Sequence, residues 1–341
     1  MLFLWFLAAF GRLEPAIVWN LEKHAVFAHW TSFDVSDQDL LAIIDPTSKQ
    51  LLLIDAMGEL RSRCGAEGDG PGEFRSPRLV QWLPGDGAFL VFDQDHRQAS
   101  LWSPTGRLVK AFHLPLKLLE SSEFLDQDSL FYIWKPYGEG GNKPTLLNYR
   151  ISSKKYAPVW EYDLKDKKFT KVPMARGETT MILPWDGFVC FDVGADFIAV
   201  TYPDAEAISI LDLKGRLLDS FTPRGIKIYP IVKEQVQRVI EERDREMAAA
   251  LKAHPNKLVV PQAWPLVKGI RIDDRNRIWV TGSENRATGF HPLVVYDRLG
   301  KILYETEIQN VPRRLHGDAL YYIHITEDTN LNLQKVIVKI P

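Results

Sequence analysis

Histidine is a frequent zinc ligand, and this sequence offers five histidines that could serve as one. None of them belongs to a His-x-His pair or a His-Glu-x-x-His motif, the spacings that place two imidazoles on one metal ion. Scattered histidines more often pack or meet solvent, so the sequence does not predict a zinc site from them. The five are His96, His113, His291, His316 and His324.

Two further segments have the composition, but not the spacing, of ligand-binding loops. The run DDRNR at 273–277 resembles a calcium loop, but it lacks EF-hand spacing and ends in Arg277, where a carboxylate would be needed. The run GEGGN at 138–142 is not followed by Gly-Lys-Ser or Gly-Lys-Thr, so it is not a phosphate loop. The first run is better explained as a turn between two strands.

The glycine-dense segment from Gly65 to Pro77, GAEGDGPGEFRSP, is the most distinctive stretch of the chain. Its backbone N–H groups could form a nest for an anion. We favour a conformational role, because glycine adopts positive φ angles without steric cost. The segment is then a connection between two β units, with Phe74 anchoring the loop to its neighbour.

Aromatic side chains near predicted loop ends could stack on a sugar or a peptide. Most of them are expected to fill the space between sheets, because large side chains are needed there. Trp134 and Tyr137 are the better candidates, because they flank Lys135 in a long loop. The candidates are Trp134, Tyr137, Trp185, Tyr202 and Trp264.

Composition excludes some classes of function. The 341 residues include 42 basic and 44 acidic side chains, with a formal charge of −2, so the chain lacks the basic surface of nucleic-acid-binding proteins. Its two cysteines, Cys64 and Cys190, form no Cys-x-x-Cys pair and are expected to be small buried side chains.

The first ten residues, MLFLWFLAAF, form an apolar run that is long enough for a signal peptide and too short to span a bilayer. It lacks a basic start and a clear cleavage site, and no lipoprotein box follows. We treat residues 1–15 as a signal-like segment, which favours a periplasmic or extracellular location. If the segment is not a signal, the location is cytoplasmic.

A repeated turn sets the architecture. An apolar strand, an Asp or Ser, two variable residues, a glycine, a polar residue and a Leu or Ile recur along the chain. The glycine suits a hairpin turn with positive φ, and the preceding Asp or Ser can bond to the turn backbone. The copies are IDAMGEL at 54–60, WSPTGRL at 102–108, LDLKGRL at 211–217 and YDRLGKI at 296–302.

The spacing of these turns predicts an all-β, six-bladed β-propeller in one domain over residues 16–341. The first two turns lie 48 residues apart, and a degenerate copy with Ser152 and Ser153 in place of the glycine fills the next gap. A strand at 16–22 is left to complete the last blade. Residues 231–253 have helical periodicity without Gly or Pro, which predicts one helical insertion, at about 226–257, between blades four and five.

The chain resembles the NHL-type six-bladed β-propellers of bacteria over most of its length. The resemblance rests on GDGPGEFRSP at 68–77, FLVFDQDHRQASLWSPTGRLV at 89–109 and IRIDDRNRIWVTGSENR at 270–286. It implies that the loops between second and third strands gather on one face and form the binding surface. The candidate ligand-binding residues on that face are Asp95, His96, Arg97, Trp134, Lys135, Tyr137, Tyr202, Asn285 and Arg286.

Members of such families share a scaffold and differ in what they bind. We expect an exported, non-enzymatic scaffold that binds a protein, a peptide or a glycan, with no nucleic acid and no transmembrane span. The alternative is a metal-dependent hydrolase or lyase with its site in the central channel. No cofactor is predicted, and calcium or zinc is left open.

Overall fold

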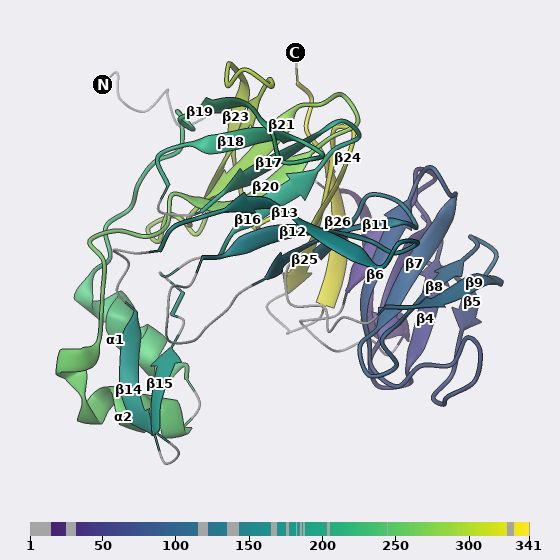
Figure 1. Cartoon of the computed structure of the whole chain (residues 1–341), viewed down its shortest axis with the longest axis horizontal. Helices are drawn as coiled ribbons and strands as arrows, with labels where there is room; N and C mark the ends of the chain where they lie inside the picture. Colours follow the sequence, from purple (N-terminus) through teal and green to yellow (C-terminus); the bar gives the residue numbers. More distant parts are fainter. Residues whose placement is uncertain are drawn as a thin grey trace, which may run out of the picture.

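Six four-stranded antiparallel sheets form a six-bladed β-propeller (Figure 1). The structure is a computed structural model that describes residues 15–24, 32–114, 122–134, 143–164, 169–174, 177–181, 183–184, 186, 188–202, 205–243, 245–325 and 331–340. The predicted signal-like segment falls almost wholly outside these residues. In the described part of the chain, no helix has the length and apolar character needed to cross a membrane.

Consecutive strands form each of the first five blades, and the first strand of the chain completes the sixth. From the innermost strand outward, blade one consists of β2 (Phe33–Val35), β3 (Leu41–Asp45), β4 (Gln50–Ile54) and β5 (Leu60–Cys64). Blade two consists of β6 (Pro77–Leu83), β7 (Ala88–Asp93), β8 (Gln98–Trp102) and β9 (Leu108–His113). Blade three consists of β10 (Ser122–Phe124), β11 (Ser129–Trp134), β12 (Thr145–Arg150) and β13 (Lys155–Glu161). Blade four consists of β16 (Cys190–Val193), β17 (Phe197–Thr201), β18 (Ile208–Asp212) and β19 (Leu217–Phe221). Blade five consists of β20 (Val267–Ile272), β21 (Ile278–Gly282), β22 (His291–Tyr296) and β23 (Ile302–Ile308). Blade six consists of β24 (Arg314–His316), β25 (Ala319–Ile325), β26 (Leu331–Ile337) and β1 (Pro15–Asn20).

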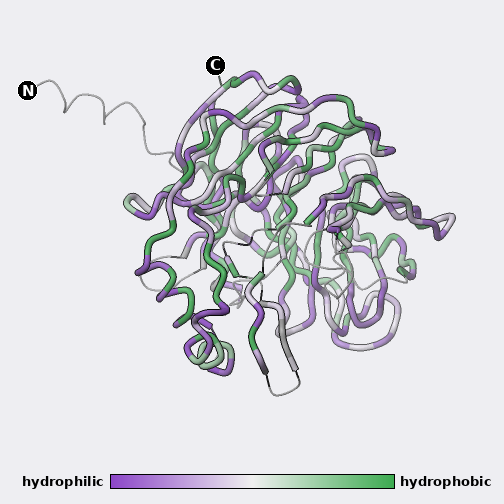
Figure 2. The backbone as a smooth tube through the Cα atoms, turned by 60° about the vertical axis from the view of Figure 1, so that its left-hand side comes forward, coloured by the Kyte–Doolittle hydropathy of each residue, from purple (hydrophilic) through white to green (hydrophobic). Residues whose placement is uncertain are grey.

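Sequence pattern separates the middle strands from the outer ones. Every residue of β3 and of β7 is buried, because other blades cover both faces of these strands. The outer strand β5 alternates between half-buried and exposed positions until Cys64. In Figure 2 much of the hydrophobic colour lies within the body, and many of the outer turns are hydrophilic.

The repeated turns form hairpins, as predicted, and they join the third and fourth strands of four blades. Their glycines have φ angles between 79° and 88°. In blade one, the Oδ1 atom of Asp55 accepts the N–H groups of Met57 and Glu59, both at 2.9 Å. Asp212 and Asp297 do the same in blades four and five. Local hydrogen bonding therefore fixes these hairpins.

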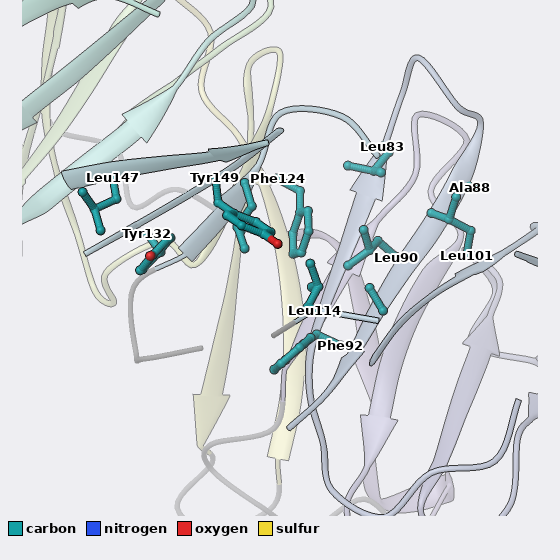
Figure 3. Close-up of a cluster of buried hydrophobic side chains, with 12 residues drawn as sticks. Leu83, Ala88, Leu90, Phe92, Leu101, Leu114, Phe124, Tyr132, Leu147 and Tyr149 are labelled. Atoms are coloured by element: carbon teal, nitrogen blue, oxygen red, sulfur yellow. The ribbon is translucent and has the colours of Figure 1, made fainter. Parts of the chain in front are cut away.

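Strand β1 pairs with β26, which confirms the expected closure of the ring by the N-terminal strand. Six hydrophobic clusters then join each blade to the next, including the last blade to the first. Figure 3 shows the cluster between blades two and three, where Phe124 of blade three lies beside Leu90 and Leu114. Interlocked side chains thus hold the propeller as one ring.

A small satellite unit extends from the propeller, and it differs from the prediction in two ways (Figure 1). The helical insertion lies between blades four and five, as predicted. It consists of two helices, α1 (Lys233–Glu241) and α2 (Arg245–Ala253), instead of one continuous helix. A hairpin of β14 (Thr170–Met174) and β15 (Gly177–Met181), inserted between blades three and four, was not predicted. Val172 of this hairpin packs against Ile240 and Leu251, so the two insertions share one small core.

The loop between β5 and β6 is held by its own side chains. The Phe74 ring is buried and lies 5.9 Å from the Trp102 ring, as expected for a residue that anchors the loop to its neighbour. The carboxylate of Glu73 accepts the N–H of Gly70 at 2.7 Å. The N–H groups of Gly68, Glu73 and Phe74 are likewise bonded to carbonyl oxygens of the same loop, so these donors are occupied from within.

Two glycines with the same backbone angle allow a matched test of this loop. Gly65 and Gly58 have φ angles of 78° and 79°, but a Cβ atom on Gly65 would overlap the Phe74 ring, whereas one on Gly58 would meet nothing. We expect Gly65→Ala to lower the free energy of unfolding by about 2–4 kcal/mol and Gly58→Ala by about 1 kcal/mol. Urea denaturation measures both losses. Equal losses would show that Phe74 does not fix the loop.

Candidate functional site

The innermost strands of all six blades line a cavity of about 520 Å³ in the central channel. Its lining includes residues at or just before the start of these strands. Each innermost strand starts where the chain crosses from the previous blade, so the cavity lies at the crossing end of the channel. The antiparallel strand order puts the loops between second and third strands, and both insertions, at this same end.

Arg314, at the start of β24, is the central cation of the channel. Its guanidinium donates to the carbonyl oxygens of Phe33 at 3.3 Å and Val80 at 3.2 Å. It also lies 3.4 Å from a carboxylate oxygen of Asp34 and 3.4 Å from one of Glu123. Arg314 therefore ties together blades one, two, three and six.

Asp34 is the ionised partner of this arginine. Burial opposes its charge, but the positive charge of Arg314 and a hydrogen bond from His316 outweigh burial and hold the pKa of Asp34 below its ordinary value. The backbone N–H of Trp82 adds a bond of 2.8 Å. Burial also acts against a charge on His316, but the hydrogen bond and the charge of Asp34 raise the pKa of this imidazole.

Glu123 and Asp192 are carboxyl groups with the opposite behaviour. Burial raises the pKa of Glu123 to about 7, and the pair with Arg314 offsets only part of that cost. Burial also raises the pKa of Asp192, although Arg271 opposes the shift and the N–H of Ile272 donates to the carboxylate at 2.6 Å. Near neutral pH Glu123 is therefore only partly ionised.

A basic group of side chains forms the β20 side of the cavity. Arg271 donates to the carbonyl oxygens of Ile270 at 3.0 Å and Arg313 at 3.1 Å, and its Nε atom has no hydrogen-bond partner among the described residues. The Nζ atom of Lys268 donates to the Pro184 carbonyl at 3.1 Å, and burial lowers the pKa of this lysine. These cations contact carbonyl oxygens rather than carboxylates.

The lining of the cavity therefore carries an excess of positive charge. Five cationic side chains line it, and Glu123 is the one carboxylate among the described lining residues. Asp34 and Asp192 lie close by but do not balance the cations. Such a cavity can neutralise a carboxylate or a phosphate. The five cations are Arg78, Lys268, Arg271, Arg313 and Arg314.

The raised pKa of Glu123 predicts a pH dependence of stability. Between its ordinary pKa of 4.5 and about 7, the folded state keeps a proton that the unfolded chain releases, so stability falls as pH rises through this window. We expect Glu123→Gln to be more stable than the wild type by about 1–3 kcal/mol at pH 8, and by much less at pH 5. Urea denaturation at both pH values tests this. The control is Glu59→Gln, which removes an exposed carboxylate, and parallel pH profiles for wild type and Glu123→Gln would refute the prediction.

The predicted site residues that the structure describes lie at the crossing end, but none lines the cavity. Asp95, His96 and Arg97 form the loop between β7 and β8, where the Nε2 atom of His96 lies 2.8 Å from Asp69. Asn285 lies in the loop between β21 and β22, where it accepts the N–H of Ala287.

The other predicted residues have separate surroundings. Arg286 pairs with Glu284 at 3.1 Å, and its guanidinium lies 5.2 Å from the centre of the Trp264 ring. Tyr202 is buried and stacks on Tyr162, with ring centres 4.7 Å apart. Trp134 ends β11, while Lys135 and Tyr137 lie outside the described residues.

Sequence reasoning did not select the charged residues of the channel. The sequence feature that could have identified them is a charged side chain inside a short innermost strand. Examples are Glu123 in SEF, Arg271 in VKGIRI and Arg314 in RLH. The DDRNR run at 273–277 forms the turn between β20 and β21, as expected. Among the described residues, no three His, Cys, Asp or Glu side chains form a group that could hold a metal ion.

Comparison with known proteins identifies the fold. No protein-family model matches the sequence, and no curated protein matches it. Among solved structures, the chain is similar to a member of the DUF4221 family from Bacteroides vulgatus, with a TM-score of 0.61 and 11% identity over 96% of this chain and 98% of that chain. A candidate exported protein from Bacteroides fragilis gives a TM-score of 0.56 and 12% identity over 97% and 96% of the two chains.

The WD40 repeats of RRP9 give a TM-score of 0.51 and 9% identity over 97% of this chain and 100% of that chain. Identities this low establish a shared propeller fold and no shared function. The strand order of the chain itself sets the number of blades at six.

Proposed function

We propose that this chain is a binding propeller that takes an anionic ligand in the central channel, at the crossing end. The observation that carries the proposal is the basic lining of the 520 Å³ cavity, with five cations against Glu123. Arg271 adds specific support, because its guanidinium donates hydrogen bonds to the carbonyl oxygens of Ile270 and Arg313 and, among the described residues, forms no close ion pair with the nearby carboxyl group of Asp192. A carboxylate or phosphate would supply the charge that these carbonyls lack.

Calorimetric titration with citrate and with inorganic phosphate, at constant ionic strength, tests the proposal. We expect saturable binding by the wild type and an affinity at least ten-fold lower in Arg271→Met, about 1.4 kcal/mol. Arg216→Met is the matched control, because Arg216 lies in an outer turn and its side chain is 77% exposed. The proposal fails if neither anion binds better than chloride, or if Arg271→Met binds as the wild type does.

Export and the NHL type are further parts of the proposal. The apolar run at residues 1–10 and the similarity to a candidate exported protein support export, and the motif at 68–77 supports the NHL type. Expression of the full chain in a bacterial host, followed by fractionation and N-terminal sequencing, tests export. Protein in the periplasm that lacks the first residues is the expected result, and uncleaved protein confined to the cytoplasm would contradict it.

A further inference from the structure

A second cavity, of about 660 Å³, adjoins the channel cavity. The two cavities share Val311 and Arg313 in their linings, so these side chains form the boundary between them. Both residues belong to the segment that crosses from blade five to blade six. The remaining lining comes from the loop between β21 and β22, the start of β22 and the end of β25. The second cavity therefore runs outward between blades five and six at the crossing end.

The two cavities differ in chemistry. The channel cavity is strongly basic, whereas four of the nine residues that line the second can both donate and accept hydrogen bonds, namely Gln309, Asn310, His291 and His324. Its one carboxylate among the described lining residues, Glu284, already pairs with Arg286 at 3.1 Å. A ligand that spans both cavities would be anionic at its inner end and neutral, with hydrogen-bonding groups, along the rest.

His291 provides one of the hydrogen-bonding groups of the second cavity. Its Nδ1 atom lies 3.0 Å from the carbonyl oxygen of Gly282, so Nδ1 carries the proton that makes this bond. Burial keeps the pKa of His291 below its ordinary value, so the ring is neutral near neutral pH. In the neutral ring Nε2 is then the acceptor. This acceptor and the side-chain amides of Gln309 and Asn310 complement the N–H and C=O groups of a peptide backbone.

We propose that the ligand is a peptide that ends in a free α-carboxylate. The carboxylate lies in the channel cavity near Arg271 and Arg313, and the preceding residues run outward past Val311 between blades five and six. Arg guanidinium groups match carboxylate geometry, and paired amides satisfy an extended backbone. A sugar chain fits less well, because the described lining of the second cavity holds no Phe, Tyr or Trp ring. This inference rests on the proposed anion site and names its ligand.

The experiment uses the full chain, immobilised, and a pool of synthetic hexapeptides randomised at every position. Half of the pool has free C-terminal carboxylates and half has C-terminal amides. Mass spectrometry of the retained fraction is expected to show free acids enriched at least ten-fold over amides. Equal retention of both halves, or retention of neither, would overturn the peptide proposal.

Three variants separate this inference from the proposed function. Asn310→Ala combined with His324→Ala should lose most peptide retention, by at least ten-fold, and keep the citrate or phosphate affinity of the wild type. Arg271→Met should lose both, and Arg216→Met should lose neither. If the double variant retains peptides as the wild type does, the peptide proposal fails and the anion site stands. If citrate, phosphate and peptides all fail to bind the wild type, the anion site itself fails.

Discussion

Replacing Arg314 by methionine is expected to lower the free energy of unfolding by about 3–5 kcal/mol at pH 8. The Arg314 side chain is only 13% exposed, and its removal leaves the carboxylate of Asp34 buried without its cation. It also removes the cation that lowers the pKa of Glu123, so at pH 8 this buried carboxyl group must either keep a proton or carry an unpaired charge. The carbonyl groups of Phe33 and Val80 lose a donor at the same time. Urea denaturation measures the loss.

Controls separate buried charge from loss of arginine in general. Arg216→Met, on an exposed outer turn, should change stability by about 0.5 kcal/mol or less. Adding Asp34→Asn to Arg314→Met should recover part of the loss, because it removes the unpaired charge. The loss should also shrink at pH 5, where Glu123 is protonated. A loss below about 1 kcal/mol at pH 8 would show that Arg314 does not hold the channel together.

Trp19→Ala is expected to lower the free energy of unfolding by about 3–5 kcal/mol. Trp19 lies on β1, is 1% exposed, and its ring centre lies 6.3 Å from that of Tyr321. Its indole N–H donates to the carbonyl oxygen of Asp55 in blade one at 2.8 Å. The residue therefore joins the closing strand to both of the blades that meet at the closure.

The adjacent residue provides the control for this variant. Val18 lies on the same strand and is 48% exposed, so Val18→Ala keeps the strand and should cost about 0.5 kcal/mol or less. Chemical denaturation gives both values, and limited proteolysis should cut the Trp19→Ala protein faster within residues 15–20. Equal costs for the two substitutions would mean that closure depends on backbone pairing alone.

The sequence predicts the blades well because their signals are local. The turn glycines, such as Gly58 and Gly106, act through their own φ angles, and the side chain three residues before each of them accepts N–H groups of the same turn. The strand at the N-terminus could also be assigned, because the last blade lacked a fourth strand. These inferences need only neighbours along the chain and the count of strands in a blade.

The satellite unit could not be predicted in full, because its stabilising contacts are distant in sequence. Val172 of the β14–β15 hairpin packs on Ile240 and Leu251, and the Thr170 hydroxyl accepts the N–H of Val259 at 3.0 Å. The described hairpin residues reach a buried cluster only through these contacts with the helices. The short hairpin therefore carries no distinctive pattern in isolation.

The channel site was even harder to predict from the sequence, because its contacts are also distant along the chain. Glu123, Arg271 and Arg314 come from three blades, and each would be read alone as a solvated charge. Only ring closure brings them to one cavity, where burial raises the pKa of Glu123 to about 7. By contrast, Tyr202 looked like a loop-end platform, but its ring stacks on Tyr162 between blades three and four. Loop position does not reveal which way such a side chain packs.

The pairing of β1 with β26 has a consequence for biosynthesis. More than 300 residues separate these partners, so β1 leaves the ribosome long before β26 exists. Contacts between such distant segments form slowly, and unpaired edges invite association with other chains meanwhile. Trp19 cannot be buried until β25 and β26 have been made. The strand that is synthesised first among these blades is therefore the last to pair with its neighbour.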